Sequence, residues 1–286
     1  MNTETIAEPR VGTAENWDAS TSCITETTRQ VEQQVRLERT SLFGIEIDPL
    51  AMDQAVDRVW RWFDELSGDC RVVVTPNLDH AVMLQEHQQL QEAYRRADLV
   101  VADGWPLVMA ARLLRRPLPA RVAGSDLVPA IFSRAHASRG LTVFLLGAGP
   151  GVANRAAERI HTNWPAVQVV GTYSPPIGFE HDEEENLEIL ARIAAAGPDL
   201  LVVGLGAPKQ ELWVTNHRVQ IHARAAICAG ATIDFLAEEK RRAPRWLRTI
   251  GLEWCHRMCS EPRRLVRRYA RDAWMFPRLL WREITG

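Results

Sequence analysis

The sequence contains little of what marks secreted or membrane-spanning proteins. Its five cysteines are odd in number and form no Cys-x-x-Cys pair, which fits a reducing compartment better than a disulfide framework. No apolar run approaches the roughly 18 residues needed to cross a bilayer, and the first forty residues lack the apolar segment of a signal peptide. We therefore expect a cytoplasmic protein without a membrane span.

Recognisable metal-binding patterns are also missing. Cys255, His256 and Cys259 lie close in sequence, but no fourth ligand accompanies them, and helical spacing explains their grouping. No Asp-x-Asp occurs, although enzymes that hold a nucleotide-sugar diphosphate through a divalent cation commonly use such paired carboxylates. The acidic run 182–185 is more typical of a solvated helix start than of a metal site. We therefore expect no metal and no other cofactor.

Positive charge is concentrated at the C-terminal end. The 286 residues are 46% hydrophobic and 24% charged, as in an ordinary globular protein with room for one large domain and an appendage. Residues 240–286 carry a net charge of +9, whereas the remainder carries −11. We predict a polar, disordered extension over residues 1–40, a folded core over residues 41–243 and a basic helical appendage over residues 244–286.

Within the core, short apolar runs alternate with segments of helical periodicity. The runs at 72–74, 99–101, 143–146, 200–203 and 225–228 are typical of buried strands. This alternation predicts an α/β fold, with a Rossmann-like parallel sheet covered by helices on both faces and followed by the helical C-terminal appendage.

The first two buried runs end in polar residues that could form a site. Thr75 and Asn77 follow the first run and Asp103 follows the second, with one helix expected between them. A right-handed crossover makes the two strands parallel, so these side chains should converge at the sheet edge where open α/β folds bind ligands. Turn chemistry explains either segment alone, and Asp103 could also cap the next helix. Its apolar neighbours would equally suit a general base.

Two glycine-rich turns follow later strands. Gly147-x-Gly149 suggests a dinucleotide site, but Val152 occupies the third glycine position and the next strand ends without an acid, which disfavours NAD. Contact with a nucleotide phosphate and a plain tight turn both remain open. The second turn, Gly204-x-Gly206-x-Pro-Lys209-Gln210-Glu211, places a cation and an amide at a helix start, which suits a diphosphate or a sugar hydroxyl. A capped helix with solvated polar residues is the alternative.

The basic C-terminal segment allows three interpretations. Nucleic acid binding is disfavoured, because the core is acidic and no recognition motif is present. A solvated helical hairpin is possible. An amphipathic anchor on an anionic membrane surface fits best, because arginine is interleaved with tryptophan and leucine. Each basic residue near such a surface contributes ~1 kcal/mol of electrostatic attraction to the lipid.

Several motifs together resemble the WecG/TagA/CpsF family of bacterial glycosyltransferases, over about residues 41–284. They are Thr75-Pro76-Asn77, Ala102-Asp103-Gly104, Arg121-Val122-Ala123-Gly124-Ser125-Asp126, the Gly204–Glu211 turn, Asp234-Phe235, and the block from Arg242 to Leu265. One departure is visible, since Ala237-Glu238 stands where Ala-Gly is expected.

The resemblance implies an inverting, metal-independent transfer of a sugar from a UDP-sugar to a polyprenyl-diphosphate-linked saccharide in the synthesis of surface polysaccharides. It implies that Asp103 is the general base with Thr75 beside it, and that arginines of the tail complete the site and neutralise diphosphate. The residues expected to bind substrate are Asn77, Arg121, Gln210, Lys209, Gly147, Gly149, Gly206, Asp234 (at the uracil), Arg257, Arg264 and Arg267. An NAD-dependent oxidoreductase and a non-catalytic nucleotide-sugar-binding protein are the rival functions, and a homo-oligomer is possible.

Overall fold

The structure is a computed structural model that describes residues 39–65, 68–116, 118–240, 242–244, 247, 253–260 and 262–285. Among residues 253–264, the side chains at 253, 257, 260 and 262–264 lie outside this description. The predicted extension lies outside it as far as residue 38. Its disorder therefore stays a prediction.

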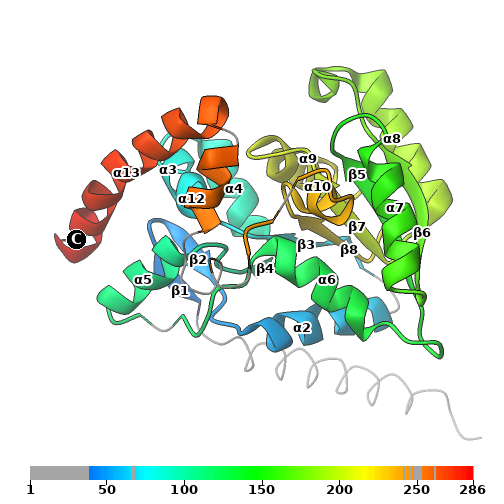
Figure 1. The fold of residues 1–286 in the computed structure, drawn as a ribbon, viewed down its shortest axis with the longest axis horizontal. Coiled ribbons are helices and arrows are strands. Elements are labelled where there is room, and N and C mark those ends of the chain that lie inside the picture. The colour runs from blue at the N-terminus through cyan, green and yellow to red at the C-terminus, as the bar shows by residue number, and fades with distance from the viewer. Residues whose placement is uncertain are drawn as a thin grey trace, which may run out of the picture. The chain divides into compact units, whose positions relative to one another are not determined.

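Six parallel strands form the central sheet of the described part of the chain, in the order β4-β3-β8-β7-β5-β6 (Figure 1). Apart from β6 at the edge, the strands consist mainly of buried apolar residues, because helices cover both faces. This confirms the predicted parallel α/β sheet. The strands are β3 (Arg71–Val74), β4 (Leu99–Val100), β5 (Leu141–Gly147), β6 (Val167–Tyr173), β7 (Leu200–Gly204) and β8 (Ala225–Cys228).

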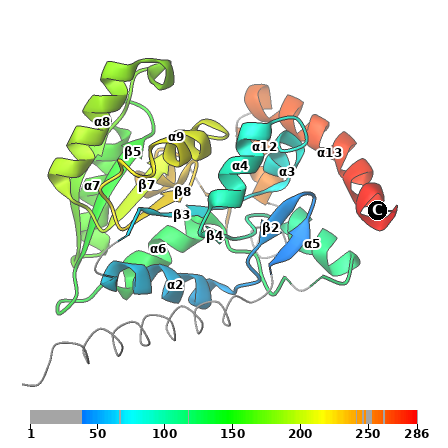
Figure 2. The same cartoon turned by 180° about the vertical axis from the view of Figure 1, so that it is seen from behind.

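Alternate strand residues pack into two separate hydrophobic clusters, one on each face of the sheet. Helix α7 lies in front of the sheet in Figure 1, and α4 and α9 lie in front of it in Figure 2, which shows the molecule from behind. The helices therefore cover opposite faces of the sheet. One face packs against α2 (Met52–Asp64), α6 (Gly124–Arg134), α7 (Val152–Asn163) and α10 (Thr232–Leu236). The other packs against α3 (Leu78–Met83), α4 (Gln88–Arg96), α5 (Trp105–Leu113), η1 (Phe179–His181), α8 (Glu183–Ala196) and α9 (Lys209–His217).

The connection between β3 and β4 differs from the prediction, because it contains two helices rather than one. The chain leaves helical geometry between Leu84 and Gln88. Side-chain amides bond the carbonyl groups around this break: Gln91 donates to the Leu84 carbonyl at 2.6 Å, and Gln85 donates to the Ala81 carbonyl at 3.1 Å. These bonds satisfy backbone groups that a continuous helix would pair internally.

The C-terminal segment forms α12 (Glu253–Ser260) and α13 (Pro262–Thr285) and belongs to the same compact unit as the sheet. Helix α13 packs against α3 and buries Leu265 and Leu279. It continues through Pro277, although proline usually ends or kinks a helix. Among the described residues, no helix combines the length and apolar character of a membrane span. The predicted boundaries at 40 and 243 stay predictions.

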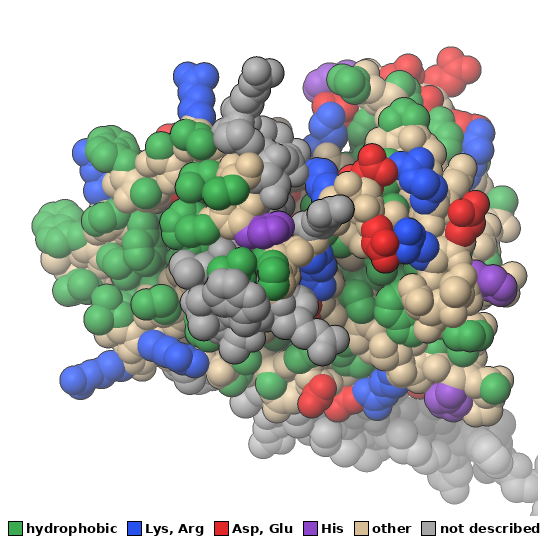
Figure 3. Space-filling view, viewed as in Figure 1, with side chains coloured by type: hydrophobic (Ala, Val, Ile, Leu, Met, Phe, Trp, Pro, Cys, Tyr) green, Lys and Arg blue, Asp and Glu red, His purple; other side chains and the backbone are tan. Residues whose placement is uncertain are grey.

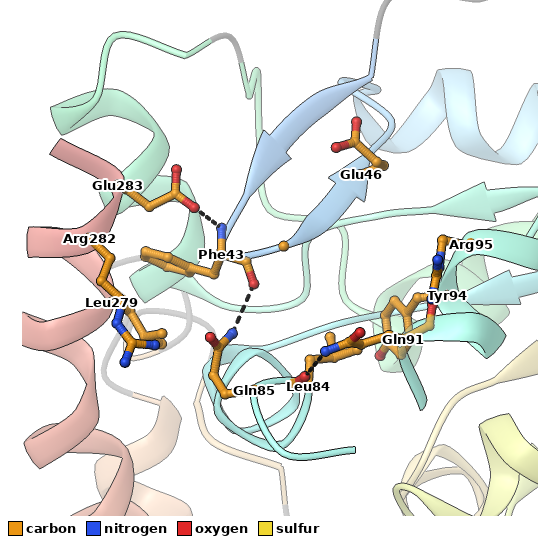
Figure 4. A pocket seen from close by; sticks show the side chains of 11 residues that line it. Phe43, Glu46, Leu84, Gln85, Gln91, Tyr94, Arg95, Leu279, Arg282 and Glu283 are labelled. Atoms are coloured by element: carbon orange, nitrogen blue, oxygen red, sulfur yellow. Dashed lines mark hydrogen bonds between the residues drawn. The ribbon is translucent and has the colours of Figure 1, made fainter. Parts of the chain in front are cut away.

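A small antiparallel hairpin, β1 (Thr40–Leu42) and β2 (Ile45–Ile47), is bonded to the end of α13. Its tip turns through Phe43 and Gly44, both with positive φ. Figure 4 shows Glu283 accepting the Phe43 N–H at 2.6 Å, while Gln85 of α3's C-terminal turn donates to the Phe43 carbonyl at 3.1 Å. Arg116, after α5, pairs with Glu283 as well. These bonds tie the hairpin, α3 and α5 to the end of α13, around a cavity of about 430 Å³.

Candidate active site

The polar ends of β3 and β4 meet as the sequence predicts. Backbone pairing of the two parallel strands continues beyond them, with the Asp103 N–H donating to the Pro76 carbonyl at 2.7 Å. Asn77 caps α3 by accepting the His80 N–H. Gly104 has a φ of 143°, and a Cβ there would lie 3.6 Å from the Cβ of Asn77. Asp103 and Asn77 therefore lie side by side.

Asp103 does not cap the helix that follows it. Helix α5 has Gly104 at its N-cap, without a side-chain cap. The Asp103 carboxylate instead lies 3.7 Å from an Arg121 guanidinium nitrogen and keeps 29% of its side chain exposed. Arg121 also pairs with Asp126 at 2.7 Å, and Arg242 pairs with Asp126 at 2.8 Å. A chain of alternating charges thus fixes the guanidinium beside Asp103.

Thr75 faces a different neighbour. Its hydroxyl is buried and donates to the carbonyl of Cys228, at the end of β8, at 3.1 Å. A Cβ on Gly124, the first residue of α6, would lie 3.1 Å from the Thr75 hydroxyl oxygen. Thr75 therefore lies on the segment beside Asp103 but joins β3 to β8, and its predicted catalytic role remains a prediction.

A cavity of about 350 Å³ opens between Asp103 and the C-terminal helices. Asn77, Asp103 and Arg121 form its polar side at the sheet edge. Aromatic side chains form much of the remaining wall, which is the arrangement expected of a pocket that binds a small organic group with a few orienting polar atoms. These aromatics are Trp105 of α5, Trp254 of α12, and Tyr269 and Phe276 of α13.

Salt bridges hold α13 over this cavity. Asp79 of α3 is buried and accepts Arg268 at 2.9 Å and Arg271 at 2.7 Å. Asp272, which also lines the cavity, has its pKa raised to about 6, first by burial and then by the negative charge of Asp79. Sequence reasoning missed these residues, because an arginine-rich helix does not reveal which arginines face the core. The predicted Arg267 is exposed, and the side chains of Arg257 and Arg264 lie outside the described residues.

The two glycine turns meet at a topological switch point. Strands β5 and β7 are neighbours, but the chain continues from β5 to β6 on one side and from β7 to β8 on the other. The Ala148 N–H donates to the Gly204 carbonyl at 3.1 Å. A Cβ on Gly147 would lie 2.6 Å from Gly204 backbone atoms, so glycine is required there for close packing. The carbonyls of Gly147 and Gly149 accept the Ser174 hydroxyl. Crevices at such switch points are where open α/β sheets bind nucleotides.

Gln210 joins two loops at this edge. Its side chain is buried, and its carbonyl oxygen accepts the N–H groups of Gly206 and Gly230, both at 3.2 Å. Its amide donates to Glu211 at 2.8 Å. Nearby, Lys209 pairs with Glu180 at 2.6 Å. The substrate-binding roles expected of Gln210, Lys209 and Gly206 stay predictions.

The predicted uracil contact, Asp234, lies on α10, which follows β8. Lys240 is 3.9 Å from its carboxylate. Glu238, where the family resemblance leads us to expect glycine, has a φ of 53°. The backbone therefore adopts the left-handed conformation that glycine tolerates best.

The sheet order sets the spacing between the two halves of the site. Asp103 follows β4, and the Gly206 turn follows β7, with β3 and β8 between them. Three strand spacings correspond to about 14 Å. The edge thus offers two regions at a separation suited to an extended nucleotide-sugar. Among the described residues, no group of three His, Cys, Asp or Glu side chains is arranged to hold a metal ion.

Comparison with known proteins confirms the resemblance seen in the sequence. The profile of the family described as "Glycosyl transferase WecG/TagA/CpsF family" matches residues 40–286. Proteins of Staphylococcus aureus strains MRSA252 and MW2, both named N-acetylglucosaminyldiphosphoundecaprenol N-acetyl-beta-D-mannosaminyltransferase, are each 29% identical to the chain over 237 residues. The match covers 83% of this chain and 91% of each relative. The chain therefore belongs to the WecG/TagA/CpsF family of glycosyltransferases.

Proposed function

We propose that this glycosyltransferase moves a sugar from a UDP-sugar to a saccharide linked to undecaprenyl diphosphate, with inversion at the anomeric carbon. The names of the Staphylococcus aureus relatives support the acceptor class, and the switch point at β5 and β7 supports a nucleotide donor. The reaction would serve the synthesis of bacterial surface polysaccharides. Family membership favours this function over the oxidoreductase and the non-catalytic binding protein.

The observation that carries the proposal is the position of Asp103 at the junction of the sheet edge and the aromatic cavity. In the proposed reaction its carboxylate takes the proton of the acceptor hydroxyl, whose oxygen attacks C1 of the donor sugar. The bond between C1 and the diphosphate oxygen breaks, and its electron pair leaves with UDP. Arg121 keeps the carboxylate oriented.

We further propose that the enzyme works at the cytoplasmic face of the membrane, where the lipid-linked acceptor is held. Figure 3 shows hydrophobic side chains gathered on the side formed by α5 and α13. Arginines at 267, 278 and 282 each follow an exposed apolar residue of α13 by one position, as in helices that lie on anionic lipid. On α13 the exposed apolar residues recur every three or four positions: Val266, Ala270, Trp274, Pro277, Trp281 and Ile284.

Substitution of Asp103 tests the proposed chemistry. We expect Asp103→Asn to lower kcat by ~10²–10⁴-fold, the usual contribution of a general base, and to leave the Kd for UDP unchanged. The assay measures UDP release from a panel of UDP-sugars, with a short-chain lipid-diphosphate sugar as acceptor. Asp182→Asn is the matched control, because asparagine can still cap α8. Turnover by Asp103→Asn within a few-fold of the wild type would refute the role of Asp103.

A further inference from the structure

A chain of buried polar groups connects the two halves of the site beneath its surface. It begins at Asn77, whose backbone N–H donates to Nδ1 of His80 at 3.0 Å. Nε2 of His80 lies 3.7 Å from Oε1 of Glu211, on α9. The same Glu211 oxygen accepts the side-chain amide of Gln210 at 2.8 Å. Helix α3 thus meets α9 in the interior, where the His80 imidazole and the Glu211 carboxyl are in polar contact without a hydrogen bond.

The other end of the chain reaches two glycine loops. Gln210 accepts the N–H groups of Gly206, after β7, and Gly230, after β8. Both glycines have positive φ, and a Cβ on either would meet no atom within 4 Å. Side-chain packing therefore does not hold these turns at the glycines, and the bonds to Gln210 supply that constraint. Glu211, which accepts the Gln210 amide, in turn packs against His80 of α3.

Packing alone does not account for the polar groups in the middle of this chain. Glu211 and His80 are 1% and 6% exposed. In the described part of the chain, Oε2 of Glu211 and Nε2 of His80 have no hydrogen-bond partner. Burying such groups unpaired lowers stability, and apolar side chains of similar volume are often as stable or more so. A role in holding other groups in place explains them better.

We propose that Glu211 and His80 are positioning residues for sugar transfer. Glu211 fixes the rotamer of Gln210, so that the Gly206 and Gly230 amides keep their places on the donor side. His80, which accepts the Asn77 N–H, packs against Glu211 from the acceptor side. The proposal rests on the proposed function for its catalytic consequence, but the effect on the two loops is independent of it.

Two substitutions at residue 211 separate positioning from bulk packing. Glu211→Gln keeps an oxygen that accepts the Gln210 amide, whereas Glu211→Leu keeps the approximate volume and removes the acceptor. We expect Glu211→Leu to raise KM for the UDP-sugar about tenfold, the equivalent of one lost hydrogen bond of ~1.4 kcal/mol. KM for the acceptor should stay unchanged, and Glu211→Gln should restore the donor KM to near the wild-type value.

Tyr94→Phe provides the matched control. Tyr94 is buried near Glu211, and its hydroxyl has no hydrogen-bond partner within the described residues. Removing that hydroxyl changes the same core without touching Gln210, so both KM values should stay at the wild-type level. Thermal unfolding of each variant shows whether it is folded, and we expect Glu211→Leu to unfold no earlier than the wild type.

Amide hydrogen exchange provides a readout that does not depend on activity. We expect the Gly206 and Gly230 amides to exchange about tenfold faster in Glu211→Leu than in the wild type, Glu211→Gln or Tyr94→Phe. A folded Glu211→Leu variant with wild-type exchange at both glycines would overturn the positioning role. So would equal losses in kcat and in both KM values together with a lower Tm, since these indicate general disruption. A wild-type enzyme that turns over no UDP-sugar would refute the proposed function alone, because the exchange result would still stand.

Discussion

In the wild type, Glu211 should cancel a loss of folding stability that His80 causes in acid. Replacing the Glu211 carboxyl should make that loss measurable. Burial, and then the positive charge of Arg268, lower the pKa of His80 from 6.5 to about 3. Burial raises the pKa of Glu211 from 4.5 to about 7. The two groups therefore have opposite effects on how stability depends on pH.

The directions follow from the protons that each state binds. As the pH falls below 6.5, the unfolded chain protonates His80 and the folded chain does not, so this histidine destabilises the fold in acid. Glu211 acts in reverse: the folded chain keeps its proton up to about pH 7, whereas the unfolded chain loses it above 4.5, so its contribution falls as the pH rises. Between pH 4.5 and 6.5, both states hold one proton on the pair, and its net contribution is flat.

Glu211→Gln removes the compensating proton. The variant should then lose about 1.4 kcal/mol of unfolding free energy per pH unit relative to the wild type, or about 2.7 kcal/mol from pH 6.5 to 4.5. Urea unfolding at pH 6.5, 5.5 and 4.5 measures this difference. The double variant Glu211→Gln/His80→Gln should follow the wild-type pH dependence again. Parallel curves for the wild type and Glu211→Gln would refute the reasoning.

Three further predictions concern the metal, the membrane and the backbone. Activity should survive EDTA and gain nothing from Mg²⁺ or Mn²⁺, and a loss on chelation that Mn²⁺ restores would contradict this. Replacing exposed Trp274 and Trp281 by serine should abolish sedimentation with anionic liposomes, whereas Leu187→Ser on α8 should not; unchanged binding of the double variant would remove α13 from the membrane contact. Glu238→Gly should raise the unfolding free energy by about 0.5–1 kcal/mol by relieving a left-handed backbone, and Glu238→Ala should not; equal denaturation curves for the two variants would argue against strain there.

Local sequence patterns predicted the sheet and the meeting of its first two strand ends. The short apolar runs before Thr75 and Asp103 are typical of neighbouring buried strands, and parallel pairing places their ends together. These inferences succeeded because each depends on residues close together in the chain. At Glu238, where the resemblance led us to expect glycine, the φ is positive, although the sequence alone did not predict that backbone conformation.

Features that depend on distant partners were not predicted. The sequence does not show that Gln210 bonds to Gly230, twenty positions away, or that Glu211 reaches His80. The basic character of α13 was evident, but the arginines that pair with Asp79 are Arg268 and Arg271, because the packing of α13 against α3 decides which side turns inward. The break between the two helices that connect β3 and β4 carries hydrogen bonds from glutamine side-chain amides. Hydrophobic periodicity does not predict such bonds.

The bond between Phe43 and Glu283 also has a consequence for folding. The two residues are 240 positions apart, and ribosomes deliver the chain from its N-terminal side. The hairpin and all six described strands can therefore form before the last turns of α13 emerge. The wall of the aromatic cavity, and the apolar side proposed to contact lipid, are completed last. The side proposed to contact lipid would then be completed only after the sheet edge that carries Asp103 has folded, which would limit premature adhesion of the nascent chain to a membrane.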